Sequence, residues 1–300
     1  MTTWTPLGNN TGGGGGGVAG LFSVAPDLLS THGGLLSGRG DVIDYSTFDG
    51  GSLDGFAPQH WDGYEPVVPI STTTYPTRSG SHALMMPLGD RPYSVAEGRK
   101  KQGAWSTAIK RLSNYREAGL KSISAHIAIG SGGTQNAPGW SNWGVGLDIQ
   151  RQNNSTRGFF KAECLYDPAN GTTAWYITNN SGSRVKVPGS DLSFIGENEN
   201  KVNYGYVRLT IDESADSGKG GYYELQVNSR VFDLRGLGAG RGQQAPQAGN
   251  WLADYRGGFN PWFGIDQRTT DTGNWPDSNS WPTTMYIDSV LVTMNDKAAS

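Results

Sequence analysis

The sequence predicts an all-β protein, an antiparallel jelly-roll β-sandwich preceded by an extended N-terminal arm. Apolar and polar residues alternate with period two in several segments between Ser122 and Met294, which is typical of strands that bury one face. Clusters of Gly, Asn, Asp and Ser separate these segments, as in tight hairpin turns. The 45 glycines and 15 prolines among 300 residues favour short strands joined by turns over long helices.

The first forty residues differ from the rest of the chain, because they contain an uninterrupted hexaglycine. Such a run has high backbone entropy and no side chains to pack, so we expect it to be disordered in an isolated monomer and ordered by neighbouring subunits. The sequence therefore predicts two parts, residues 1–40 as an arm for docking and assembly and residues 41–300 as the sandwich domain. The assembly residues of the arm are Gly12, Gly13, Gly14, Gly15, Gly16 and Gly17.

Each strand predicted in the domain is hydrophobic on one face. In the closing strand, the alternation places Ile287, Ser289 and Leu291 opposite Asp288 and Val290. We expect roughly ten to fourteen strands and one short helix over Leu112–Ala118. The clearest hairpin signal is Asn170-Gly171. The alternating segments are Ser122–Ile129, Trp143–Arg151, Tyr204–Asp212, Tyr222–Asn228 and Tyr286–Met294.

Charge and cysteine content exclude several classes of partner. With 24 basic and 27 acidic residues the net charge is −3, which leaves no surplus to neutralise a phosphate backbone, so no nucleic acid is expected. No stretch approaches a membrane span of about 18 apolar residues, and no signal peptide is expected at the N-terminus. The single cysteine, Cys164, permits no internal disulfide, and its phase with Phe160 and Ala162 predicts burial.

Three segments resemble the concanavalin-like and carbohydrate-binding-module jelly rolls over about residues 42–293. They are Phe48–Phe56, Ser79–Met86 and Tyr286–Val290. The resemblance implies the fold, whereas members of these families include lectins, lyases, glycosidase accessory modules, viral adhesins and virion structural proteins.

In some members of these families, an acidic residue of the last strand and an early acidic residue hold a structural calcium. The resemblance would assign this role to Asp288 with Asp49 or Asp44. The alternative is that Asp288 caps a turn or accepts backbone hydrogen bonds. No other cofactor and no other metal site is expected.

No catalytic residues are predicted. Glu163 and Glu224 lie on predicted strands, but the Glu-x-Asp-x-Glu strand of the jelly-roll glucanases is absent. The segment Phe159–Glu163 is similar to one strand of the lyase-type members, which use Arg, His, Gln and Tyr on a concave sheet, yet no segment supplies a matching Gln-x-His. His126 is expected on the polar face of its strand, and no two histidines have metal-ligand spacing.

Five tryptophans lie in or beside predicted loops, where an exposed indole could stack on a sugar ring. Trp140, Trp275 and Trp281 have Pro, Gly, Asn or Ser beside them and are the candidates for glycan binding. The alternative for these three is packing over loop edges. Trp143 and Trp262 are in phase with apolar runs and are expected in the core.

The leading hypothesis from the sequence is a non-enzymatic bacteriophage virion protein, such as a capsid decoration or tail-associated protein. It would be made in the host cytoplasm and displayed on the virion surface. Residues 1–40 would dock it to other virion subunits, in a homo-oligomer or lattice. The first alternative is a glycan-binding module or adhesin that contacts surface glycans. The second is a polysaccharide lyase or hydrolase.

Overall fold

The structure is a computed structural model, and the residues it describes lie within one compact unit, Arg39–Ser300. The hexaglycine segment and Trp140, Trp275 and Trp281 lie outside the described residues, so their predicted roles stay predictions. The described residues are 41–60, 68–71, 77–78, 80–87, 105–112, 119–131, 141–151, 156–167, 172–179, 181–191, 204–215, 220–237, 242–244, 258–267 and 283–294.

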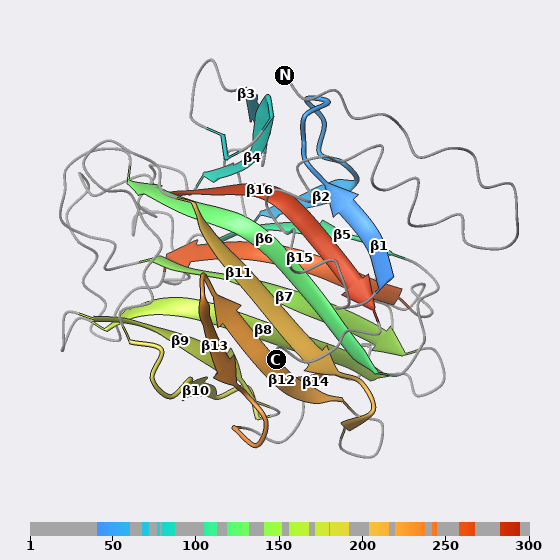
Figure 1. Ribbon diagram of the computed structural model, residues 1–300, viewed down its shortest axis with the longest axis vertical. Helices are drawn as coiled ribbons and strands as arrows, with labels where there is room; N and C mark the ends of the chain where they lie inside the picture. Colours follow the sequence, from blue (N-terminus) through green and yellow to red (C-terminus); the bar gives the residue numbers. More distant parts are fainter. Residues whose placement is uncertain are drawn as a thin grey trace, which may run out of the picture. The chain divides into compact units, whose positions relative to one another are not determined.

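Two antiparallel sheets make up this unit, and the first, sheet A, lies in front in Figure 1. Its order is β13-β12-β11-β6-β16-β4-β3, and β1 also pairs with β16. The chain's first described strand therefore lies beside its last. The strands of sheet A are β1 (Asp41–Ser46), β3 (Val68–Ser71), β4 (His82–Pro87), β6 (Leu120–Ser131), β11 (Gly205–Asp212), β12 (Gly221–Val227), β13 (Arg230–Asp233) and β16 (Thr283–Met294).

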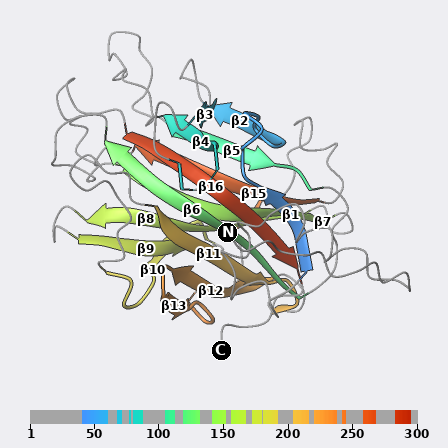
Figure 2. The ribbon, with the colours of Figure 1, turned by 45° about the horizontal axis from the view of Figure 1, so that its top comes forward.

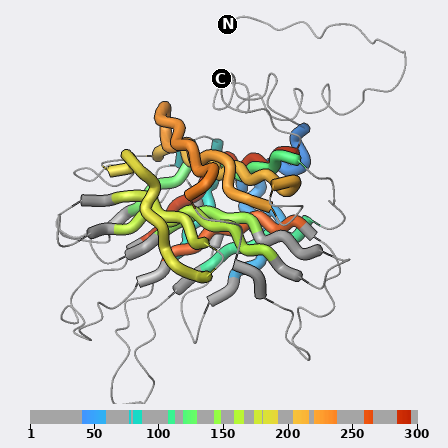
Figure 3. The backbone as a smooth tube through the Cα atoms, turned by 90° about the horizontal axis from the view of Figure 1, so that it is seen from below, coloured from blue at the N-terminus to red at the C-terminus, as the bar shows by residue number. Residues whose placement is uncertain are grey.

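Sheet B lies behind sheet A in Figure 1, and the sheets are visible as two layers in Figure 3. Its order is β10-β9-β8-β7-β15-β5-β2, and β14 also pairs with β8. The strands of sheet B are β2 (Phe56–His60), β5 (Trp105–Lys110), β7 (Ser141–Arg151), β8 (Thr156–Asp167), β9 (Thr172–Thr178), β10 (Arg184–Lys186), β14 (Gly242–Gln244) and β15 (Gly258–Gln267).

The all-β jelly-roll prediction is confirmed, and the predicted strand number is too low. The described chain has sixteen strands, because β2, β3, β10, β13 and β14 have only three to five residues each and show no readable alternation. β8 and β9 pair antiparallel up to Asp167 and Thr172, as expected for a hairpin at Asn170-Gly171. Of the predicted helix, Leu112 forms a bridge with Phe259, and residues 113–118 lie outside the described residues.

The predicted alternation of the closing strand is wrong in its second half. The register between β16 and β6 shifts between Asp288 and Leu291, and Ser289 has a φ of 53°. This β-bulge reverses the phase of the strand. As a result Ile287, Val290 and Val292 enter the core, whereas Leu291 pairs with Ser124 on the outer face.

The core lies between the two sheets and is built from the inward residues of both. The Trp143 and Trp175 rings meet edge to face with centroids 4.9 Å apart, and Phe160 meets Tyr222 of sheet A at 5.3 Å. Trp143 is in the core as predicted, and so is Cys164, whose burial raises the pKa of its thiol. Figure 2 shows the long strands β6, β7, β8, β15 and β16 that frame this core. In the described residues we find no helix that could cross a membrane.

Candidate functional site

Glycines form the middle of the outer face of sheet B, the face that points away from the core. A Cβ added to Gly146 of β7 would lie 2.2 Å from Trp262 Nε1, and one added to Gly264 of β15 would lie 2.5 Å from Trp262 Cζ3. The indole of Trp262 therefore lies directly over both backbones. Phe159 of β8 stacks on it, with centroids 4.9 Å apart and ring planes at 13°.

The predicted burial of Trp262 is confirmed, but the residue lies on the outer face of sheet B and not between the two sheets. Trp262 is 6% exposed, but it pairs with Gly146 on one side and Ile109 on the other. Its neighbour Phe263 takes the inward position instead. The apolar run Phe259–Ile265 misled the prediction because both faces of β15 are buried.

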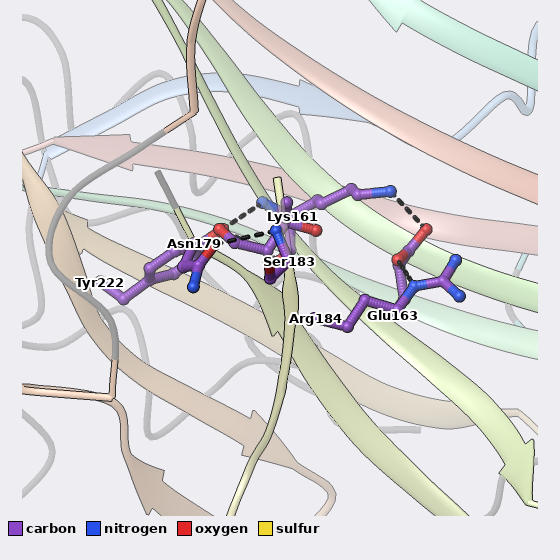
Figure 4. A network of polar contacts seen from close by, with 7 residues as sticks. Lys161, Glu163, Asn179, Ser183, Arg184 and Tyr222 are labelled. Carbon is purple, nitrogen blue, oxygen red and sulfur yellow. Dashed lines mark hydrogen bonds and ion pairs between the residues drawn. The ribbon is translucent and has the colours of Figure 1, made fainter. Parts of the chain in front are cut away.

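A charged cluster lies beside the aromatic pair. Glu163 of β8 accepts a hydrogen bond from Lys161 Nζ at 2.6 Å and one from Arg184 Nε at 3.3 Å. Figure 4 shows the two cations reaching the carboxylate, Lys161 from β8 itself and Arg184 from β10, on the far side of β9. Glu163 is 6% exposed, and a buried carboxylate requires such partners. The three side chains together carry one positive charge.

Tyr222 of sheet A fixes the position of Lys161 from inside the sandwich. Its hydroxyl accepts a hydrogen bond from Lys161 N at 3.0 Å (Figure 4) and donates one to Thr178 O at 2.8 Å. Burial raises the pKa of Tyr222, so the phenol stays protonated and can donate. The phenol thus bridges β8 and β9 just beyond Ala162 and Ile177, the pair at which their ladder ends on this side.

A tight turn places Arg184 at the start of β10. Asn179 Oδ1 accepts a hydrogen bond from Ser183 N at 2.9 Å (Figure 4) and one from Ser181 N at 3.1 Å. An Asn side chain that caps the backbone in this way stabilises a turn. The turn sets Arg184 opposite Thr178.

The register aligns the site in one row across five strands. Arg184 pairs with Thr178, Lys161 pairs with Gly146, and Gly146 pairs with Trp262. Continuing the β8–β9 register by one residue sets Thr178 opposite Lys161. In the adjacent row, Tyr176 of β9 pairs with Glu163. Lys161 and Thr178 of this row, and Phe159 and Tyr176 beside it, are only partly buried, so solvent reaches this part of the face.

Sequence reasoning missed most of this row. Lys161 and Glu163 were visible as the polar face of an alternating run. Arg184 gave no signal, because its strand has three residues. The pattern Trp-Gly-Val-Gly-Leu at residues 143–147 was the available hint that one sheet face lacks side chains.

The two candidate carboxylates lie on opposite faces of the molecule. Glu224 is on the outer face of sheet A, where Arg208 Nη1 and Thr210 Oγ1 each lie 3.5 Å from its Oε1. Glu163 is on the outer face of sheet B, across a core about 10 Å thick. The two therefore cannot flank one glycosidic bond. His126 lies outward on sheet A as predicted, opposite Asp288 and Tyr206.

The acidic residues proposed for calcium each have protein partners. Asp44 Oδ1 lies 2.8 Å from Lys110 Nζ, and Asp49 Oδ1 accepts a hydrogen bond from Ser81 N at 2.6 Å. Asp288 is fully buried on sheet A and accepts a hydrogen bond from Ser289 Oγ. In the part of the chain that the structure describes, no group of three or more His, Cys, Asp or Glu residues could hold a metal ion. The calcium site stays a prediction.

Comparison with known proteins gives distant structural likenesses. No protein-family model matches the chain, and no curated protein matches it in sequence. The alginate lyase Aly36B is 12% identical, with 82% of this chain and 99% of that one covered at a TM-score of 0.39. An endo-1,3-β-glucanase from Streptomyces sioyaensis is 12% identical, with 84% and 95% covered at 0.42. The carbohydrate recognition domain of Emp46p is 8% identical, with 86% and 95% covered at 0.41.

The prediction of a non-enzymatic virion protein is contradicted by these comparisons. The similar solved structures are mostly carbohydrate-active enzymes, and the virion context has no support among them. At these identities and TM-scores no activity transfers to this chain. The evidence for a function must therefore come from the outer face of sheet B.

Proposed function

We propose that the protein binds a polysaccharide on the outer face of sheet B. One observation carries the proposal. On this partly exposed face, an aromatic pair packed over glycines lies beside a charged cluster. Ligand sites commonly combine apolar or aromatic surface with a few polar groups that fix orientation. Sugars match this combination because their rings have apolar faces and hydroxyl edges.

Phe159 is the accessible half of the aromatic pair. Trp262 beneath it is 6% exposed, so a sugar would contact Phe159 first. We expect Phe159→Ala to weaken polysaccharide binding by about tenfold, given the energy of aromatic contacts. Val231→Ala on sheet A is the matched control, because Val231 is an apolar side chain with 47% exposure on the other sheet.

Binding is measured by affinity electrophoresis and calorimetry against alginate, a β-1,3-glucan and mucin. We expect at least one of these polysaccharides to bind. We expect Phe159→Ala to weaken that binding and Val231→Ala to leave it unchanged. The proposal fails if none binds, or if both variants bind as the wild type does. Thermal unfolding of each variant confirms that it is folded.

The second candidate function is cleavage of the bound chain by elimination. Among the described side chains of β8, β9 and β10, Glu163 is the one carboxylate, which does not provide the pair that glycoside hydrolysis uses. Elimination needs no such pair. It needs a base and a cation that neutralises the sugar's carboxylate. Tyr176 lies partly exposed opposite Glu163, beside Lys161.

In this reaction the base takes the proton beside the sugar carboxylate and the bond to the leaving oxygen breaks. A carbon–carbon double bond forms between the two carbons, and the leaving oxygen takes up a proton. The new double bond absorbs ultraviolet light. We expect Tyr176→Phe to bind alginate as the wild type does while losing this absorbance change. If Tyr176→Phe cleaves alginate as fast as the wild type does, Tyr176 is not the base.

A further inference from the structure

Three hydrogen-bonding groups along the row on sheet B are shielded from water and have no partner. They are Arg184 Nη2, Thr178 Oγ1 and Trp262 Nε1. A shielded donor without an acceptor costs free energy, so such groups are rare in folded proteins and call for an explanation. Here they lie on one cross-strand row, on β10, β9 and β15.

All three groups can donate a hydrogen bond. The guanidinium and the indole are donors only, and the hydroxyl of Thr178 can donate as well as accept. The chemistry that matches three donors is a ligand group that only accepts. Carboxylate and sulfate groups have this property, whereas a sugar hydroxyl also brings a donor.

The charge of the cluster also favours an anionic ligand. Lys161 and Arg184 share the single carboxylate of Glu163. These three side chains therefore keep a net positive charge of one. Their side chains keep 17% and 28% exposure, which gives a ligand access to the β10 end of the row. Hydrogen bonds between a guanidinium and an anion are also stronger than neutral ones.

We propose that Arg184, Thr178 and Lys161 form a seat for the acidic group of an anionic polysaccharide, with Trp262 Nε1 as a further donor along the row. This inference rests on the proposed function and specifies its ligand. The row from β10 to β15 spans four strand spacings, roughly 19 Å. A chain lying along it would contact the seat with one sugar and the aromatic pair with another.

The test measures dissociation constants for a polyuronate, a sulfated polysaccharide and a neutral glucan of similar length. We expect one of the acidic polymers to bind more tightly than the glucan, and the tighter one identifies the acidic group. We expect Arg184→Gln to weaken that binding by roughly 10- to 100-fold and Thr178→Val by a smaller factor. Binding should also weaken as salt concentration rises.

Arg235→Gln is the matched control for charge. Arg235 is 63% exposed and pairs with Asp233 at the edge of sheet A, so its removal changes net charge equally but leaves the seat intact. Trp262→Phe keeps an aromatic ring over Gly146 and Gly264 but removes the N–H donor together with the five-membered ring of the indole. We expect acidic binding to be unchanged in Arg235→Gln and severalfold weaker in Trp262→Phe.

The outcomes separate this inference from the proposed function. If only the neutral glucan binds, the acidic seat is wrong and polysaccharide binding stands. If Arg235→Gln weakens acidic binding as much as Arg184→Gln, general charge attraction explains the result and the seat is wrong. If none of the three polymers binds, both proposals fall. Thermal unfolding confirms that each variant is folded.

Discussion

At the scale of residues, the site depends on positions where side chains are missing. The indole of Trp262 lies over Gly146 and Gly264 with no room for a methyl group. Larger residues at either position would lift the ring and move Phe159 with it. The glycines thus determine where the aromatic pair lies relative to Lys161.

We expect Gly146→Ala to destabilise the fold by about 1–3 kcal/mol, as overpacking does. A Cβ there would also lie 2.4 Å from Phe160 O, which is backbone and cannot rotate away. Urea denaturation measures the change. Gly50→Ala is the control, because a Cβ at Gly50 would lie 3.9 Å from Ser52 Oγ, an ordinary contact. Equal stability of the two variants would contradict the close approach of Trp262.

Tyr222 allows a prediction on pH dependence. Its pKa is raised by burial, whereas in the unfolded chain it titrates near about 10. Its contribution to stability is therefore complete below the unfolded pKa and declines as pH rises above it. At neutral pH we expect Tyr222→Phe to cost roughly 1–3 kcal/mol, because Lys161 N and Thr178 O lose a partner.

The difference in stability between wild type and Tyr222→Phe should narrow as pH rises past about 10. Urea denaturation at a series of pH values from neutral upward measures it. A difference that stays constant over this range would show that the phenol ionises as readily in the fold as outside it.

At the scale of elements, the central strands of both sheets could be predicted from the sequence, and the short edge strands could not. Ile123, Ala125 and Ile127 of β6 alternate cleanly with polar residues and are all buried. Arg184 lies in a strand too short for any periodicity, and its place is set by the turn at Asn179. The site was missed for this reason, since one of its two cations, Arg184, comes from an edge strand.

The bulge in β16 also lay beyond prediction, because alternation alone cannot show where a strand changes phase. Ser289 is fully buried with a positive φ, a conformation that β-branched residues resist. We expect Ser289→Val to destabilise the fold by on the order of 1–3 kcal/mol. We expect Ser289→Gly to cost much less, because glycine adopts this φ without strain. Thermal unfolding measures the stability of the two variants. Equal losses of stability in Ser289→Val and Ser289→Gly would contradict the argument from the positive φ.

At the scale of the whole molecule, all the described strands lie within residues 41–294. β1 pairs with β16, so the domain closes on itself without residues 1–40. We propose that residues 41–300 fold alone. We expect the chain lacking residues 1–40 to give the same β-type circular dichroism and the same unfolding midpoint as the full chain. Loss of cooperative unfolding on this deletion would contradict the domain boundary.

The two faces of the sandwich differ in their polar chemistry. On sheet A, Arg208 donates to Ser122 and lies against Glu224, and Ser122 pairs with Thr293. On sheet B, Arg184, Thr178 and Trp262 each keep a shielded hydrogen-bonding group without a partner, and the three lie along one cross-strand row. This alignment is the reason for placing the ligand on sheet B.

Hydrogen–deuterium exchange with and without polysaccharide tests that placement most directly. The account predicts that a polysaccharide the protein binds slows exchange in β8, β9 and β10, at residues 156–167, 172–178 and 184–186, and leaves β6 and β11 of sheet A unchanged. Protection confined to sheet A, with β8 to β10 unaffected by the bound ligand, would contradict it.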